Sequence, residues 1–358
     1  MTEVFTIRCK GCGASLVYEA GSEKLKCPYC NSEQEIPATY DGIEEIDLES
    51  ALNAEQMAKE SIAEHTVLSC RSCGAQIAYG KVRAKCDFCG SESISEATLQ
   101  TQSIRPQGVL PFSLNVQTAQ ELLQQWMKSL WFAPSDLTRR TRVEDLRGVY
   151  LPTWTFDAQV QARWSAIPGY YRTRTERYYD QAARSWQTRS VTYTEWGSPV
   201  SGYHQDFFDD VLVSGLRSLP NRYLEDIGEF PTTTDLRKYD PAFFLGWDVA
   251  LPDKPLTEAW QEGYQRIHDM TAEACKRAIP GDTYKDFKMQ LRLSGLTTKL
   301  IYVPIYIVAY RYRGKPYRVV IHGRSGVVSG DRPISWVKVG ITVALILAGI
   351  GVLIFLTS

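Results

Sequence analysis

Eight of the nine cysteines fall into four Cys-x-x-Cys pairs, the residue pattern with the clearest chemistry in the chain. The first two pairs supply Cys9, Cys12, Cys27 and Cys30, and the last two supply Cys70, Cys73, Cys86 and Cys89. Two such turns facing each other offer four thiolates, the tetrahedral ligand set that Zn²⁺ prefers. Four thiolates leave no open coordination position, so the sequence predicts two structural Zn²⁺ ions as cofactors and no catalytic metal.

The two cysteine sets belong to a repeat, because the segment from Cys9 to Tyr18 returns as the segment from Cys70 to Tyr79. Each unit is too short to bury a sufficient core unaided, so metal binding must supply much of its folding free energy. A rubredoxin-like iron site is an alternative use of such cysteines, and a thioredoxin-like redox role is another. The ninth cysteine, Cys275, falls in a helical run and is expected to be an ordinary part-buried thiol.

The positions of these repeats divide the 358 residues into five predicted parts. They are a zinc ribbon at 1–38, an acidic helical spacer at 39–65, a second zinc ribbon at 66–98, an α+β domain at 105–335 and a transmembrane helix at 339–356. Charge follows the same division, since residues 1–104 hold 9 basic against 16 acidic residues. The acidity lies almost entirely in the spacer, between Thr39 and His65, and would repel phosphate backbones there.

The predicted α+β domain combines two helical runs, Thr118–Trp131 and Pro255–Ile279, with antiparallel strands. A polar turn near Asp180 is expected to join two alternating segments into a long hairpin. The pattern Tyr150-Leu-Pro152 resembles Tyr302-Val-Pro304, which indicates an old internal duplication.

The chain ends with an uncharged apolar segment, Val339–Leu356. As a helix it would be about 27 Å long, which nearly matches a hydrocarbon core of about 30 Å. This predicts a single-pass, tail-anchored membrane protein. Basic residues lie before the segment and none follow it, so the bulk of the chain is expected in the cytoplasm.

Other candidate chemistry is weaker. The segment Tyr170–Trp196 mixes arginines with aromatic residues, which is typical of a platform for nucleic acid or anionic lipid. Its acidic residues reduce the charge, so the favoured interpretation is the exposed face of a two-stranded ribbon. His204 with Asp209 is the one candidate acid–base pair. No Gly-x-x-x-x-Gly-Lys-Ser/Thr loop occurs, so the chain is no helicase motor by itself. No catalytic or cofactor-binding residue is predicted beyond the metal ligands.

The two ribbons, the strand with Pro304, the hairpin from Arg313 to Gly330 and the apolar end together resemble a bacterial family of zinc-ribbon membrane proteins. Its members often carry names borrowed from primosomal helicase or from transcription-factor zinc ribbons. The resemblance implies partners of the phage-shock type or stomatin-like and flotillin-like scaffolds. Where the family is expected to have Asn-Gly-Gln-Thr-Gly, this chain has His322-Gly-Arg-Ser-Gly326.

Three functions remain open on this sequence. The first is a non-enzymatic, tail-anchored adaptor whose ribbons recruit protein partners at the membrane, in a membrane stress response. The second is a membrane-tethered nucleic-acid-binding protein without its own motor. The third is an enzyme with a site in the α+β domain.

Overall fold

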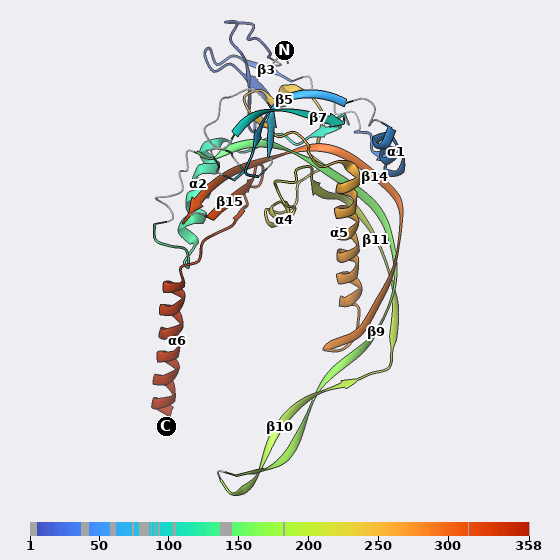
Figure 1. The fold of residues 1–358 in the computed structure, drawn as a ribbon, viewed down its shortest axis with the longest axis vertical. Coiled ribbons are helices and arrows are strands. Elements are labelled where there is room, and N and C mark those ends of the chain that lie inside the picture. Colours follow the sequence, from blue (N-terminus) through green and yellow to red (C-terminus); the bar gives the residue numbers. More distant parts are fainter. Residues whose placement is uncertain are drawn as a thin grey trace.

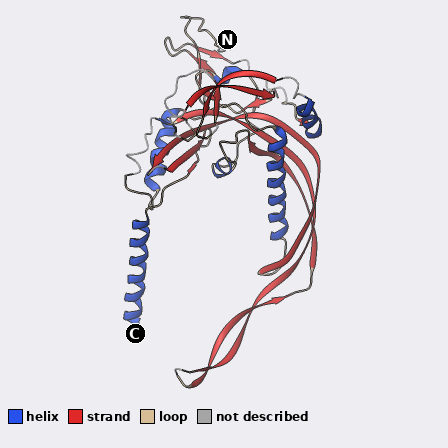
Figure 2. Cartoon of the chain, viewed as in Figure 1, coloured by secondary structure: helices blue, strands red, loops and turns tan. Residues whose placement is uncertain are grey.

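The computed structural model describes residues 6–36, 43–57, 62–73, 75–78, 86, 88–89, 91, 94–102, 105–136, 145–181, 183–313 and 315–357. The body is an arch formed by very long strands, and the two cysteine-rich units lie over its convex side (Figure 1). A two-stranded hairpin and the C-terminal helix extend from opposite ends of the arch (Figure 2).

Each cysteine-rich unit has a small antiparallel sheet. The first consists of β1 (Val17–Glu19), β2 (Lys24–Lys26) and β3 (Glu33–Glu35) in that order. The second has the order β6 (Gln76–Ala78), β5 (Ile62–Cys70) and β7 (Ile94–Gln102). Between them lie β4 (Ile46–Asp47), which pairs with the body, and the helix α1 (Leu48–Met57).

The body is one large sheet built on β9 (Arg147–Asp180) and β14 (Thr283–Tyr312), which pair antiparallel along most of their length. The other strands are β10 (Ser185–Trp196), β11 (Val200–Ser214), β15 (Lys315–His322), β16 (Val328–Gly330) and the short β8 (Gly108–Val109), β12 (Arg237–Lys238) and β13 (Asp248–Val249). Short helical turns, α4 (Arg222–Asp226) and η3 (Pro241–Phe244), lie in the connection between β11 and β13.

The body consists of two corresponding halves. In one half the order is β8, α2 (Val116–Ser129), β9 and β11, with β10 between β9 and β11 as an addition. In the other half the same places are taken by β13, α5 (Leu256–Arg277), β14 and β15. β8 runs parallel to β14, and β13 runs parallel to β9, so each half contributes its short strand to the other.

The two Tyr-x-Pro motifs lie directly across from each other where the halves meet, with Tyr150 opposite Pro304 and Pro152 opposite Tyr302. The carbonyl of Pro152 accepts from the amide of Gly215, and that of Pro304 accepts from the amide of Gly323. Equivalent bonds at equivalent places support the duplication that the sequence indicates.

The helix α5 lies inside the arch against β9 and β11 (Figure 1). Its buried residues recur at helical spacing, from Leu256 through Gly263 and Ile267 to Cys275. Gly263 permits close packing, because a Cβ there would lie 2.6 Å from the ring of Phe156. The predicted helices are confirmed, with α2 beginning after Asn115, whose side chain accepts from the amide of Thr118.

The predicted fold class is wrong. The body is dominated by antiparallel sheet where an α+β domain of mixed helices and strands was expected at 105–335, because β9 and β14 each continue for the length of the arch. The long hairpin within it is confirmed, with Asp180 opposite Ser185 and Gly169 opposite Trp196.

The prediction of a transmembrane helix at 339–356 is also wrong. Among the residues that the structure describes, no helix combines the length and the apolar character needed to cross a membrane. The helix there is α6 (Trp336–Thr357), and its first turn is bonded to the body, since the Lys338 ammonium donates to the carbonyls of Trp131 and Ala133. Tail anchoring, the single-pass topology, the membrane as partner and the localisation that followed from them are therefore overturned.

Candidate metal centres

The first cysteine cluster forms where two tight turns face each other. Cys9 and Cys12 precede β1, and Cys27 and Cys30 lie between β2 and β3. The amide of Gly13 donates to the carbonyl of Cys9, and Gly13 has a positive φ of 74°, a conformation that glycine adopts without strain. The amide of Gly11 donates to the Cys9 sulfur at 3.3 Å. The turn therefore directs its cysteine sulfurs toward the centre of the cluster, and the Gly11 amide points at one of them.

The second cluster repeats this design with Cys70, Cys73, Cys86 and Cys89. The amide of Cys70 bonds to the carbonyl of Ala75, and the amide of Cys86 bonds to the carbonyl of Ser91. In the first cluster the corresponding bonds join Cys9 to Ala14 and Cys27 to Ser32. Both predicted sets of four cysteines are thus brought together.

The spacing of the sulfurs suits a tetrahedral metal. The Sγ–Sγ separations are 3.5 Å for Cys9 and Cys30 and 3.4 Å for Cys12 and Cys27. In the second cluster they are 3.6 Å for Cys70 and Cys89 and 3.7 Å for Cys73 and Cys86. A tetrahedron with Zn–S bonds of about 2.3 Å has sulfurs about 3.8 Å apart, whereas a disulfide needs about 2.05 Å. The clusters could each hold a metal ion.

Local hydrogen bonds favour the thiolate at some ligand positions. The Ser32 hydroxyl, together with backbone amides, lowers the pKa of Cys9 to about 6. In the second cluster a hydrogen bond from Cys73 lowers the pKa of Cys86 to about 5, and the shared proton raises the pKa of Cys73. Thiolates are the form that binds metal.

The two clusters differ in how they sit on the body. Tyr29 and Phe88 occupy the same place in the repeat, directly before the fourth cysteine of each set. Tyr29 is 81% exposed, while Phe88 is fully buried. The first unit contacts the body through its strand side, where the Tyr18 hydroxyl donates to the carbonyl of Phe112. The second unit contacts the body through β6, where the carbonyl of Gln76 accepts from the amide of Leu251, and also through its metal-binding turn, which holds Phe88.

Arginines of the body gather around the buried turn of the second cluster. The Arg318 guanidinium donates to the carbonyls of Phe88 and Ser218. Arg318, Arg217 and Arg222 line a cavity of about 380 Å³ together with Cys73 and Cys89. A divalent ion with four thiolates carries two negative charges, and the Arg318 guanidinium would offset part of that charge in an occupied second cluster. Arg217 and Arg222 are already ion-paired, with Glu258 and Asp331. Sequence spacing gave no signal for this contact.

Several other predicted residues do not form a site. The neighbour of His204 is Asp206, two residues further along β11, whose carboxylate lies 3.7 Å from the His204 ring. Asp209, the predicted partner, belongs to a separate acidic cluster. The proposed acid–base pair is therefore not assembled. Cys275 is fully buried on α5, and burial raises the pKa of its thiol.

The arginine-rich hairpin of β9 and β10 has a mosaic of opposite charges. Arg172 pairs with Glu195, and Arg174 and Arg189 both pair with Glu176. Arg174 also lies over the ring of Tyr193, a cross-strand contact. The paired carboxylates neutralise much of the charge that a nucleic-acid platform would need. This arrangement fits the exposed face of a two-stranded ribbon.

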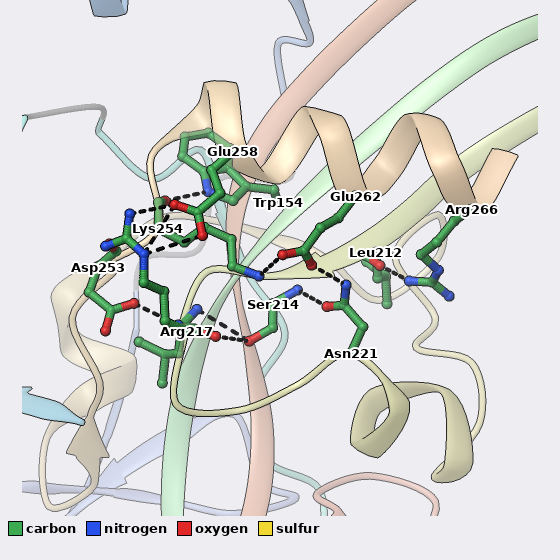
Figure 3. Close-up of polar contacts among 11 residues, drawn as sticks. Trp154, Leu212, Ser214, Arg217, Asn221, Asp253, Lys254, Glu258, Glu262 and Arg266 are labelled. Carbon is green, nitrogen blue, oxygen red and sulfur yellow. Dashed lines mark hydrogen bonds and ion pairs between the residues drawn. The ribbon is translucent and has the colours of Figure 1, made fainter. Parts of the chain in front are cut away.

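Charged groups also surround the start of α5, where they join it to the loop after β11 (Figure 3). Arg217 bonds through two nitrogens to Glu258, and the Lys254 ammonium is 2.7 Å from Glu262. Glu262 in turn accepts from the amide nitrogen of Asn221, whose oxygen accepts from the backbone of Ser214. Lys254 is buried and paired, so this network holds the loop in place and offers no nucleophile.

Comparison with known proteins identifies no family. No family model matches the chain, and no solved structure matches it. A protein of Bacillus subtilis (strain 168) named "Uncharacterized protein YdjG" is similar, with 21% identity over 339 residues that cover 94% of this chain and 92% of that protein. The likeness therefore runs along both chains, and the printed name assigns no activity.

Proposed function

We propose that this protein is a non-enzymatic zinc-ribbon adaptor. In this proposal each cysteine cluster holds one structural Zn²⁺, as in the zinc-ribbon family that the sequence resembles. The supporting features are the tetrahedral sulfur spacing and the absence of an open ligand position in a set of four thiolates. The ion fixes the two turns of each ribbon and performs no reaction.

The observation that carries the recruiting role is the contrast between Tyr29 and Phe88. The second ribbon places its turn aromatic into the body, and the first ribbon presents the equivalent ring to solvent beside the exposed Cys12 and Cys30. Tyrosine is enriched in protein interfaces because its rigid ring gives large contact area at low entropic cost. The second ribbon thus attaches to the body through its turn, and the first ribbon is the contact surface for a protein partner.

A photo-crosslinking amino acid at position 29 tests this role in the cells that produce the protein. The control position is Tyr203, a tyrosine on β11 that is 55% exposed. We expect discrete protein adducts from position 29 that are missing at position 203 and that disappear when Cys27 and Cys30 are replaced by serine. Equal adduct patterns at both positions, with zinc content intact, would show that the first ribbon recruits no partner.

A further inference from the structure

The search for further sites leads to an acidic cluster in the middle of the large sheet. Asp157 of β9 lies beside Asp209 and Asp210 of β11, and one oxygen from each falls within 4.8 Å of the others. The pairing of β11 with β9 is interrupted between Phe208 and Val211, and that of β14 with β9 between Ser294 and Thr297. Asp157 is therefore flanked by bulges on both sides, a feature common next to functional sites.

The chain's own groups satisfy these carboxylates only in part. Asp157 accepts from the amide of Asp210 at 2.6 Å and from the Thr297 hydroxyl at 2.6 Å. Lys299 places its ammonium 2.8 Å from Asp210 Oδ1 and 3.0 Å from Glu45. Asp210 Oδ2 is buried and has no hydrogen-bond partner among the residues that the structure describes, and the Asp210 side chain is only 4% exposed.

Charge at this place is unbalanced. Three aspartates and Glu45 surround the ammonium of Lys299, so full ionisation would leave a net charge of −3 on these groups. Asp157 and Asp210 are the buried carboxylates among them, while Asp209 and Glu45 reach solvent. Such charge is costly unless a counter-ion or a proton offsets it. Burial raises the pKa of Asp157 to about 6 and also raises the pKa of Asp209.

We infer that Asp157, Asp209 and Asp210 form a binding site for one hard divalent cation of the Mg²⁺, Ca²⁺ or Mn²⁺ class. Carboxylate oxygens are the ligands these ions prefer, and thiolates, which would select zinc, are not among them. Asp210 Oδ2 is an available ligand atom, because it accepts no hydrogen bond from the described residues. Asp209 is exposed and gives the cluster access to solvent. The cation would join β9 to β11 at their shared bulge.

The test measures Mn²⁺ binding to the full, zinc-loaded chain by isothermal titration calorimetry at pH 7, with zinc content measured before and after. We expect one saturable Mn²⁺ per chain and a dissociation constant raised about tenfold or more by Asp210→Asn. The matched control is Asp206→Asn, an exposed aspartate of the same strand, which should bind as the wild type does. Should Asp210→Asn fail to fold by circular dichroism, the exposed Asp209→Asn takes its place with the same expectation.

Replacing the competing cation separates a metal site from an ion-pair network. Lys299→Gln removes the ammonium and should tighten Mn²⁺ binding, because the ammonium then no longer competes with Mn²⁺ for Asp210. The inference is overturned by a wild-type chain without saturable binding, by equal affinities in the wild type and the Asp209 and Asp210 variants, or by binding confined to Lys299→Gln. The last result would show that Lys299 itself fills the site.

Discussion

At the scale of single residues, the pair Tyr29 and Phe88 separates the roles of the two ribbons. Both are aromatic, and both directly precede the last cysteine of a set. Their environments differ because the body offers Phe88 a pocket near Arg318 and offers Tyr29 none. Equal sequence positions thus place one ring in the packing of the body and leave the other exposed, as the proposed contact role requires.

This contrast predicts opposite consequences for the same kind of truncation. Phe88→Ala should lower the free energy of unfolding by about 3 to 5 kcal/mol, the usual cost of removing a buried phenyl ring. Tyr29→Ala should change it by less than about 0.5 kcal/mol, as is usual for exposed positions. Urea unfolding of both variants checks this, and similar losses would mean that Tyr29 is also a packing residue.

The buried environment of His322 leads to a second prediction. Its ring is stacked on Phe230, its Nδ1 accepts from the amides of Arg324 and Ser325, and its Nε2 donates to the carbonyl of Glu229. Burial lowers its pKa to about 4, below the ordinary value of 6.5. The unfolded chain therefore binds a proton between these values that the folded chain does not.

Stability from His322 is consequently full above pH 6.5 and is lost as the pH falls toward 4. Between pH 7.5 and 5.5 the wild type should lose roughly 1 kcal/mol more than a His322→Gln variant. Unfolding free energies at the two pH values measure this difference. Identical pH dependence in the two chains would contradict a neutral, buried imidazole.

At the scale of elements, the acidic spacer is part of the body rather than a free connector. Glu55 of α1 is buried, and its carboxylate accepts from the amides of Leu256 and Thr257 and from the Thr257 hydroxyl. These amides begin α5, where unpaired N–H groups need acceptors. The N-terminal residue of α5 has no side-chain cap of its own, since Pro255 precedes it.

Removing this distant cap should weaken the attachment of α1 and α5 together. Glu55→Ala should cost about 1 to 3 kcal/mol, because it leaves buried amides without an acceptor. Glu55→Gln, which keeps one acceptor oxygen, should cost less. Hydrogen exchange at the first turn of α5 locates the effect, and unchanged protection there in Glu55→Ala would rule out the capping role.

For the whole molecule, local patterns were readable from the sequence and distant contacts were not. The cysteine spacing specifies each cluster because its ligands lie on two short turns, and the facing Tyr-x-Pro motifs were visible as a repeat. The acidic cluster combines Asp157 with residues of β11 and β14 far along the chain, so no window of sequence contains it. The fold class and the membrane span were overturned because apolar and alternating runs do not reveal how far strands continue or what a helix contacts.

The central claim is that the chain holds two structural zinc ions. The metal-binding turn of the first ribbon is exposed, and that of the second ribbon is packed against the body. Zinc release to an excess of a coloured chelator tests it most directly on the intact chain. We predict that two zinc ions per chain are released in two phases. The fast phase should be missing in a Cys12→Ser, Cys30→Ser variant, because these exposed ligands belong to the first ribbon. Fewer than two zinc ions, or a single phase that this variant leaves unchanged, would contradict the account.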